Sequence, residues 1–187
     1  MVPFRITVCG IKELENFVGT GVSHVLSILD PGEREPEAFY RFDAHKRLDL
    51  RFHDIIEELP GQLPPEPDHV RQLLAFGRGL DLDPKPSHLI VHCHMGVSRS
   101  TASMILLLAQ ALPDRPAKEI AAEVVRIRPQ AWPNLRLITF GDALLRRQGE
   151  LIAAAREIYR ARAAISPEAV RFIRDVGRLA EIEGLDV

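Results

Sequence analysis

HLIVHCHMGVSRS, residues 88–100, is the stretch of sequence from which the fold can be predicted. Residues 88–92 form a short apolar run that is typical of a strand in the middle of a sheet. The helix expected next, from Arg99 to Leu112, is apolar on nearly all sides and should be buried. The loop between them therefore leaves a buried strand at its carboxyl end and enters the amino terminus of a buried helix.

Outward from this unit, apolar or alternating runs predict three more strands, at residues 4–8, 22–29 and 48–52. Helices are expected from Asp68, as N-cap, to Gly77, from Pro116 to Ile127, from about Leu135 to Ala164, and from Ser166 with Pro167 at the first helical position. Strands followed by helices predict an α/β fold, a single domain with a central, mostly parallel sheet flanked by helices. We expect this domain to span residues 1–165, with residues 166–187 forming a C-terminal helical extension.

Composition narrows the classes of protein. The chain has 187 residues, 46% of them hydrophobic, and a net charge of −2, so no global basic field attracts nucleic acid or a membrane surface. Its two cysteines, Cys9 and Cys93, make no disulfide framework and suit a reducing compartment. Residues 1–17 lack the apolar core of a secretory signal, and the longest apolar stretch, residues 102–112, is too short to span a bilayer. We expect a cytoplasmic enzyme without nucleic-acid or membrane partners; its oligomeric state is not predicted.

The loop itself predicts a phosphate site. Backbone N–H groups at a helix N-terminus lack partners, and the helix dipole favours an anion there. Successive amides from His94 to Arg99 can curl around three phosphate oxygens, and Gly96 supplies the conformation of a tight loop. Such a position favours ionisation of a thiol, so Cys93 is placed to attack phosphorus. Arg99 offers a planar fork for two oxygens, and the Ser100 hydroxyl can donate a hydrogen bond to the departing thiolate.

Residues 92–100 match the HCxxGxxR(S/T) signature, and the chain resembles the protein tyrosine phosphatase superfamily, in particular its dual-specificity branch, from Ser23 to about Leu145. The resemblance implies a cysteine-phosphatase-like fold, hydrolysis of phosphomonoesters through a phosphocysteine intermediate, and no metal or organic cofactor. It implies that the substrate phosphate is held by His94, Met95, Gly96, Val97, Ser98 and Arg99. It further implies that His92 holds the loop by hydrogen bonds and that Asn134 steadies it, although Asn134 is equally well read as a helix cap.

A thiolate phosphatase also needs a general acid to protonate the leaving oxygen. The family places an aspartate on a loop after an upstream strand, and Asp54 fits this position. Asp49 is the main competitor, followed by Asp43, Glu57 and Asp68, and Asp54 is otherwise a loop residue or the N-cap of the turn after it.

Several alternatives stay open from sequence alone. The neighbouring histidines and Cys93 suggest metal, but adjacent residues on a strand point to opposite faces, and no second ligand pair is spaced for zinc. A phosphate-binding module without turnover and a rhodanese-like sulfurtransferase are the rival classes. Because the loop interior carries no lysine or arginine, protein phosphotyrosine, with phosphoserine or phosphothreonine in addition, is favoured over a phosphoinositide or another small phosphoester. An oxidised Cys9–Cys93 pair is left open.

Overall fold

The computed structural model describes residues 4–80 and 88–185. In this part of the chain one parallel sheet runs in the order β1-β4-β2-β3, and its strands are β1 (Arg5–Gly10), β2 (His24–Leu29), β3 (Lys46–Arg51) and β4 (His88–Cys93). β4 is paired on both sides and is buried along its whole length. The predicted α/β class and the central position of β4 are therefore confirmed.

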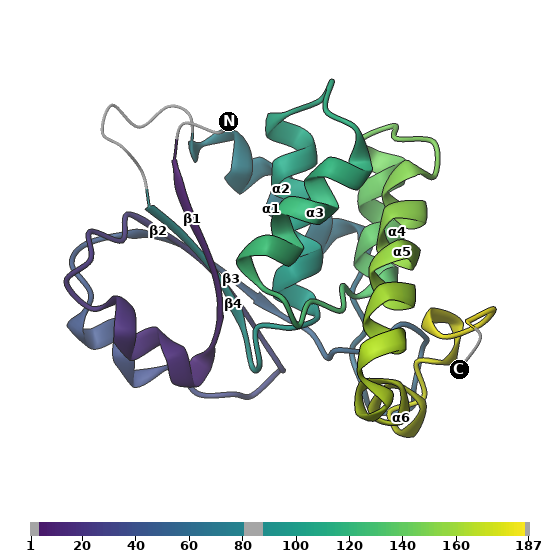
Figure 1. The fold of residues 1–187 in the computed structure, drawn as a ribbon. Coiled ribbons are helices and arrows are strands. Elements are labelled where there is room, and N and C mark those ends of the chain that lie inside the picture. Colours follow the sequence, from purple (N-terminus) through teal and green to yellow (C-terminus); the bar gives the residue numbers. More distant parts are fainter. Residues whose placement is uncertain (1–3, 81–87, 186–187) are drawn as a thin grey trace.

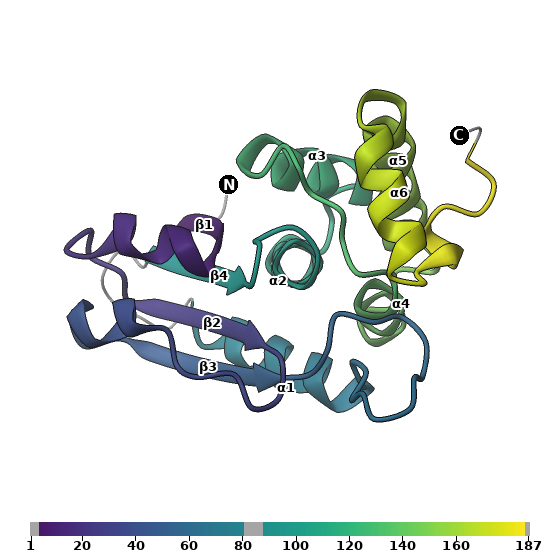
Figure 2. The ribbon, with the colours of Figure 1, turned by 90° about the horizontal axis from the view of Figure 1, so that it is seen from below.

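The α-helices lie on one side of the sheet, and the short 3-10 helices η1 (Ile11–Phe17) and η2 (Glu37–Arg41) cover the other side (Figure 1). The α-helices are α1 (Pro67–Arg78), α2 (Arg99–Ala111), α3 (Ala117–Ile127), α4 (Leu135–Leu144), α5 (Glu150–Ile165) and α6 (Pro167–Asp175), and a further 3-10 turn, η4 (Leu179–Glu181), follows α6. Figure 2 shows α2 between the sheet and the outer helices. Residues 99–109 of α2 are all buried, as its apolar sequence predicts.

The predicted helix over residues 135–164 is wrong in one respect, because it is two helices. α4 ends at Leu144, and Arg146 and Gln148 adopt positive φ values of 56° and 54° before α5 begins. The Asp142 carboxylate, at the end of α4, accepts hydrogen bonds from the amides of Gly149 and Leu151, at 2.7 and 2.9 Å. These bonds satisfy amides in the first turn of α5, so they stabilise the break.

The predicted cap at Asp68 is also wrong. α1 starts with Pro67 at its first position and Glu66 as N-cap, so Asp68 lies inside the first turn, where its carboxylate accepts a hydrogen bond from Gln72 at 2.9 Å. The fixed φ of proline suits the first helical position, which moves the helix start upstream.

Two apolar clusters hold the layers together. The larger one lies between the sheet and the α-helices and includes Phe52, Val91 and Tyr159. α6 contributes Val170 and Ile173 to it, so the C-terminal helix packs on the same core. The smaller cluster lies on the opposite face of the sheet, under η1 and η2. None of the helices in the described residues has the length and hydropathy that crossing a bilayer requires.

Candidate active site

The loop after β4 makes a tight turn that only glycine allows. Gly96 has a φ of 69°, a region that side chains rarely adopt. A Cβ atom there would also lie 2.4 Å from the carbonyl carbon of Cys9 in β1. The loop therefore folds back against the neighbouring strand at this point.

The peptide oxygens of residues 94–98 all accept hydrogen bonds from the surrounding structure. The donors are Ile11 N to His94 O (3.0 Å), Arg128 Nη2 to Met95 O (2.8 Å), Arg128 Nε to Gly96 O (3.0 Å), Trp132 N to Val97 O (2.9 Å), and Ala102 N to Ser98 O (3.0 Å). In a trans peptide the N–H points away from the C=O, so these oxygens direct the following amides toward the inside of the loop. Within the described residues, no amide from 95 to 98 donates to another residue. The loop thus presents a cradle of free donors, as an oxyanion requires.

Cys93 closes β4 at the floor of this cradle and is 3% exposed. Its Sγ lies 3.2 Å from Oγ of Ser100, in the first turn of α2. The hydroxyl is therefore within hydrogen-bonding distance of the thiol.

Arg99 is the first residue of α2, and its side chain is 3% exposed. Its Nη1 donates to Oδ1 of Asp30 at 2.6 Å and to the carbonyl oxygen of Phe52 at 2.5 Å. Its Nη2 lies 2.8 Å from Nδ1 of His94, which must accept because a guanidinium has only donors. The Nε–H is buried and has no hydrogen-bond partner among the described residues. The guanidinium is thus held through Nη1 and Nη2, and its Nε–H remains as a hydrogen-bond donor.

Asp54 lies just after β3 and is anchored through one oxygen. Its Oδ1 accepts hydrogen bonds from Oγ of Ser98 at 2.7 Å and from Nδ2 of Asn134 at 2.9 Å. Oδ1 also lies 3.2 Å from Nη1 of Arg178. Burial alone would raise the pKa of Asp54, but Arg178 and Arg99 outweigh it and hold that pKa below its usual range.

Asn134 combines the two roles that the sequence left open. Its Oδ1 accepts from the amide of Leu137 at 3.1 Å, so it caps α4. Its amide nitrogen reaches Asp54 and the carbonyl oxygen of Ile55, and its backbone N–H lies 3.4 Å from Ser98 O in the loop. Its side chain therefore contacts the aspartate and not the loop itself.

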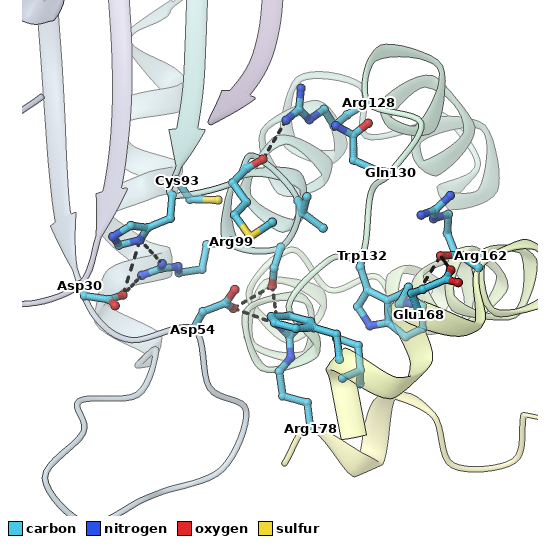
Figure 3. Close-up of a pocket in the computed structure, with 18 residues that line it drawn as sticks. Asp30, Asp54, Cys93, Arg99, Arg128, Gln130, Trp132, Arg162, Glu168 and Arg178 are labelled. Atoms are coloured by element: carbon cyan, nitrogen blue, oxygen red, sulfur yellow. Dashed lines mark hydrogen bonds and ion pairs between the residues drawn. The ribbon is translucent and has the colours of Figure 1, made fainter. Parts of the chain in front are cut away.

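A cavity of about 680 Å³ lies over Cys93, a volume typical of small-ligand sites. Figure 3 shows Cys93, Arg99 and Asp54 on one side of it, with Arg162, Glu168 and Trp132 opposite. Apolar side chains also line it, and two of them are exposed: Met95 of the loop (66%) and Phe172 of α6 (54%). The cavity therefore joins the cradle of amides to a wider space that is lined largely by apolar side chains.

The expected hydrogen bonds from His92 to the loop are wrong, because His92 lies on the other face of the sheet from this cavity and neither ring nitrogen has a hydrogen-bond partner among the described residues. Its ring is fully buried and packs edge-on against Phe39, with 5.4 Å between ring centroids. Burial lowers the pKa of His92 to about 4, so the ring is neutral at pH 7. Cys9 pairs with His92 in the sheet register and belongs to the smaller apolar cluster, whereas Cys93 belongs to the larger one. The two thiols therefore face opposite sides of the sheet.

The other acids considered from sequence lie away from the cavity lining. Asp49 forms an ion pair with Arg47 at 2.8 Å, on the exposed side of β3. Asp43, Glu57 and Asp68 are also absent from the residues described as lining the cavity. Its acidic lining residues are Asp54, Asp30 and Glu168. In the described residues, no group of three or more histidine, cysteine, aspartate and glutamate side chains is placed to share a metal ion.

Sequence reasoning missed Asp30, Arg128 and Arg178. Asp30 had a usable signal, because it directly follows the buried strand β2 and so lies at the same edge of the parallel sheet as Cys93. Arg128 and Arg178 had none, since they reach the loop from the end of α3 and from the segment after α6. Residues so distant in sequence meet the loop only through tertiary packing.

By sequence, the chain matches no protein-family model and no curated protein. Its fold is shared by solved structures of cysteine phosphatases. Human DUSP28 matches with a TM-score of 0.56 at 16% identity, over 76% of this chain and 94% of that one. DUSP15 matches with a TM-score of 0.54 at 18% identity (79% and 90%), and PTPMT1 in complex with PI(5)P with 0.52 at 15% (77% and 94%). The chain thus has the dual-specificity phosphatase fold, which confirms the predicted resemblance at the level of fold.

Proposed function

We propose that the chain is a cysteine-dependent phosphomonoester hydrolase that acts on protein phosphotyrosine. The observation that carries the proposal is the loop of residues 93–99, which combines a thiol, a cradle of unpaired amides and the unpaired Nε–H of Arg99. Donors arranged in this way around one nucleophile fit a phosphoryl group, whose charge is spread over three equatorial oxygens in the transition state.

The first chemical step transfers the phosphoryl group to Cys93. The thiolate attacks phosphorus, a P–S bond forms, and the bond from phosphorus to the leaving oxygen breaks. The carboxylic acid of Asp54 gives its proton to that oxygen, so the product leaves as a neutral phenol or alcohol. The amides of the loop and Arg99 stabilise the charge on the phosphoryl oxygens throughout.

The second step hydrolyses the phosphocysteine. The Asp54 carboxylate takes a proton from water, the water oxygen attacks phosphorus, and the P–S bond breaks. The thiolate of Cys93 leaves, and its developing charge accepts a hydrogen bond from Ser100, 3.2 Å away. Inorganic phosphate is released, and both Cys93 and Asp54 return to their starting states. This chemistry requires a reduced thiol, which supports a cytoplasmic location.

The apolar side chains that line the cavity support an aryl phosphoester as substrate. Met95, Val97, Trp132, Phe172 and Ile173 line it, and such side chains can pack against an aromatic ring. A phosphotyrosine side chain presents a ring of this kind between its phosphate and the peptide.

A phosphoinositide is the second candidate, because arginines from outside the loop face the same cavity. Arg128 is occupied by Glu13, with two contacts of 2.7 Å, and Arg178 by Glu181 and Asp54. Arg162 lines the cavity with its Nε buried and unpaired among the described residues, so it remains for a second anionic group. A neighbour with this fold, PTPMT1, was solved with PI(5)P bound. One such arginine is weaker support than the apolar lining, so phosphotyrosine stays the first choice.

Turnover of a substrate panel tests the proposal. We expect the parent protein to hydrolyse a phosphotyrosine peptide with a higher kcat/KM than a phosphothreonine peptide or a short-chain phosphoinositide. Cys93→Ser should abolish turnover of all three, while inorganic phosphate still binds. Acid-quenched parent should carry phosphate on Cys93. Phosphate binding without turnover by the parent would indicate a non-catalytic module, and turnover of thiosulfate instead would indicate a sulfurtransferase.

Asp54 is tested through its leaving group. Asp54→Asn should slow hydrolysis of the phosphotyrosine peptide by roughly 10²-fold or more, and that of an aryl phosphate with an acidic phenol much less. The matched control is Asp49→Asn, which should change neither rate. If only the control variant shows the leaving-group dependence, the acid is Asp49.

A further inference from the structure

The segment after α6 returns to the cavity and buries a charged pair there. Gly177, with a φ of 76°, turns the chain at the end of α6, and η4 follows. Within this turn Arg178 and Glu181 form an ion pair at 2.6 Å, and their side chains are 3% and 0% exposed. A buried pair of charges is costly unless its remaining polar groups find partners.

Glu181 finds its partners in the framework behind the loop. Its Oε2 accepts from Nε1 of Trp132 at 2.8 Å, and its Oε1 accepts from the amide of Leu135, in the first turn of α4, at 2.9 Å. Trp132 in turn stacks on Tyr159, with 5.0 Å between ring centroids, and its amide holds Val97 O of the loop. Arg178 is therefore mounted on the same elements that shape the loop.

Arg178 has a second set of contacts, on the reactive side. Its Nη1 donates to Oγ of Ser98 at 2.8 Å and lies 3.2 Å from Oδ1 of Asp54 (Figure 3). A purely structural ion pair needs only Glu181. These extra contacts bring the guanidinium to the acid and to the phosphate loop together.

The three contacts to Asp54 converge on the same oxygen. Ser98, Asn134 and Arg178 all meet Oδ1, and in the described part of the chain no hydrogen-bond donor contacts Oδ2. An oxygen that accepts two hydrogen bonds and lies 3.2 Å from a guanidinium nitrogen is a poor place for a proton, so the acid form carries its proton on Oδ2. The convergence fixes the rotation of the carboxyl group and leaves Oδ2 to the substrate.

We propose that Arg178 is a positioning residue for the general acid, and that the segment after α6 is therefore part of the catalytic machinery. The inference rests on the proposed function, in which Asp54 protonates the leaving group. Arg178 orients the Asp54 carboxyl through Oδ1, ties it to Ser98 of the loop, and is itself held by Glu181.

The charge of Arg178 also sets when Asp54 is protonated. Burial raises the pKa of Asp54, Arg178 lowers it, and Arg99 lowers it further, so that the net shift is downward. The charged and titratable groups around Asp54 are Arg178 and Glu181 of the C-terminal segment, Arg99 of α2 and Tyr159 of α5, while Cys93 and His94 line the same cavity. A dianionic phosphoester bound at the loop opposes the arginines and raises the pKa of the acid in the complex.

The test is the pH dependence of kcat for an aryl phosphate with a poor leaving group, because kcat reports the pKa of the acid in the substrate complex. Activity is lost as pH rises through the pKa of the acid, so this pKa appears as the alkaline limb of the profile. Arg178→Met removes the charge and keeps an apolar stem, so the limb should move upward by about one to three pH units. Arg174→Met is the matched control, because Arg174 is an exposed arginine on α6 and its loss should leave the limb unchanged.

A second variant keeps the test decisive if Arg178→Met does not fold. Arg178→Lys retains the charge but cannot span Ser98 and Glu181, so the limb should stay near that of the parent. Its rate should fall several-fold with the poor leaving group and stay unchanged with an acidic phenol, since only the former needs a positioned acid. In an Asp54→Asn background, Arg178→Lys should cause no further loss.

Two results would overturn the inference. One is an alkaline limb that does not move in folded Arg178→Met, and the other is an equal loss for both leaving groups in Arg178→Lys. Either would make Arg178 a structural residue of the core while leaving the proposed function intact. Failure of the proposed function gives a different result from failure of this inference, because the parent protein would then show no turnover that depends on Cys93.

Discussion

The three guanidinium nitrogens of Arg99 have different surroundings. Nη1 is held by Asp30 and by Phe52 O, Nη2 by His94, and Nε by no residue in the described ranges. These contacts fix the plane of the fork before substrate arrives. An arginine that is oriented in advance loses less entropy when it binds two phosphoryl oxygens.

Arg99→Lys tests whether this planar fork matters beyond its charge. An ammonium group can satisfy Asp30 or the phosphate but cannot donate in parallel to two oxygens. We expect kcat/KM for the phosphotyrosine peptide to fall roughly 10²-fold or more. A lysine variant within a few-fold of the parent would show that charge alone suffices at this position.

Ser100→Ala tests the hydroxyl 3.2 Å from Cys93 Sγ. In the proposed mechanism its hydrogen bond stabilises the thiolate as a leaving group, so loss of the hydroxyl should slow breakdown of the phosphocysteine more than formation of the phosphocysteine. Steady-state turnover should therefore fall, and the pre-steady-state burst of phenol should become larger and clearer. An unchanged burst together with an unchanged rate would leave Ser100 as an ordinary helix residue.

Single residues were predictable from sequence where the backbone between them is continuous. Cys93, Arg99 and Ser100 lie on one strand, loop and helix, so their spacing alone brings them together. Asp54 required the family resemblance, because it comes from another strand. Arg178 was not predictable, since its place depends on how α6 and the turn after it pack on the larger core.

At the scale of elements, the loop of residues 94–98 is held from outside by an ion pair. Arg128, at the end of α3, donates to the carbonyl oxygens of Met95 and Gly96. Glu13 in η1 receives two hydrogen bonds from the same guanidinium at 2.7 Å and one from the amide of Gly10 at 2.6 Å. Two elements from distant parts of the chain, η1 and the end of α3, therefore fix the outward direction of the Met95 and Gly96 carbonyls, and with it the inward direction of the following amides.

Glu13→Gln should weaken the contact between residue 13 and Arg128 without removing it. The amide keeps the shape of the carboxylate but loses its charge, so Arg128 is held less firmly and the loop amides are less well ordered. We expect the inhibition constant of inorganic phosphate to rise roughly fivefold, which corresponds to about 1 kcal/mol. Glu123→Gln is the control, because its partner Arg126 lies on the exposed face of α3 and does not contact the loop. Equal inhibition constants of inorganic phosphate for both variants and the parent would contradict a role of Glu13 in holding Arg128 against the loop.

The helices and strands were predicted well where burial determines their bounds. They were predicted poorly where a single side-chain contact determines where a helix ends. β4 and α2 are buried on all sides, so their apolar runs mark them in the sequence. The break between α4 and α5 depends on the Asp142 carboxylate binding two amides beyond the helix end. A pattern of hydrophobic residues contains no trace of such a contact.

For the whole molecule, the parallel sheet explains why the site is where it is. Strands that run the same way bring their carboxyl ends to one edge, and β2, β3 and β4 are followed there by Asp30, Asp54 and the loop of residues 94–98. The helical side then closes this edge, with α6 and Arg178, the residue before η4, lining the cavity. The C-terminal extension therefore covers the core and completes the walls of the site through the same packing.

His92 makes the stability of the folded protein depend on pH. The ring is buried in β4, and burial lowers its pKa from the ordinary value of 6.5 to about 4. The unfolded chain therefore binds a proton below about pH 6.5 when the folded protein does not, so stability must fall as pH drops toward 4. From these two pKa values, the loss at pH 5 is about 2 kcal/mol.

Urea unfolding at pH 7.5 and pH 5 measures this loss, with the free energy of unfolding compared between parent and His92→Asn. Asparagine does not titrate, so the parent should lose about 2 kcal/mol more than the variant between the two pH values, whatever the variant loses at pH 7.5. His45→Asn, which changes a histidine outside the central strand, should lose as much as the parent. Glu13 and Asp54 also have lowered pKa values, and their contributions are common to all three proteins. If the parent and His92→Asn lose the same free energy, then the buried ring is protonated in the folded protein and β4 is less closed than its burial indicates.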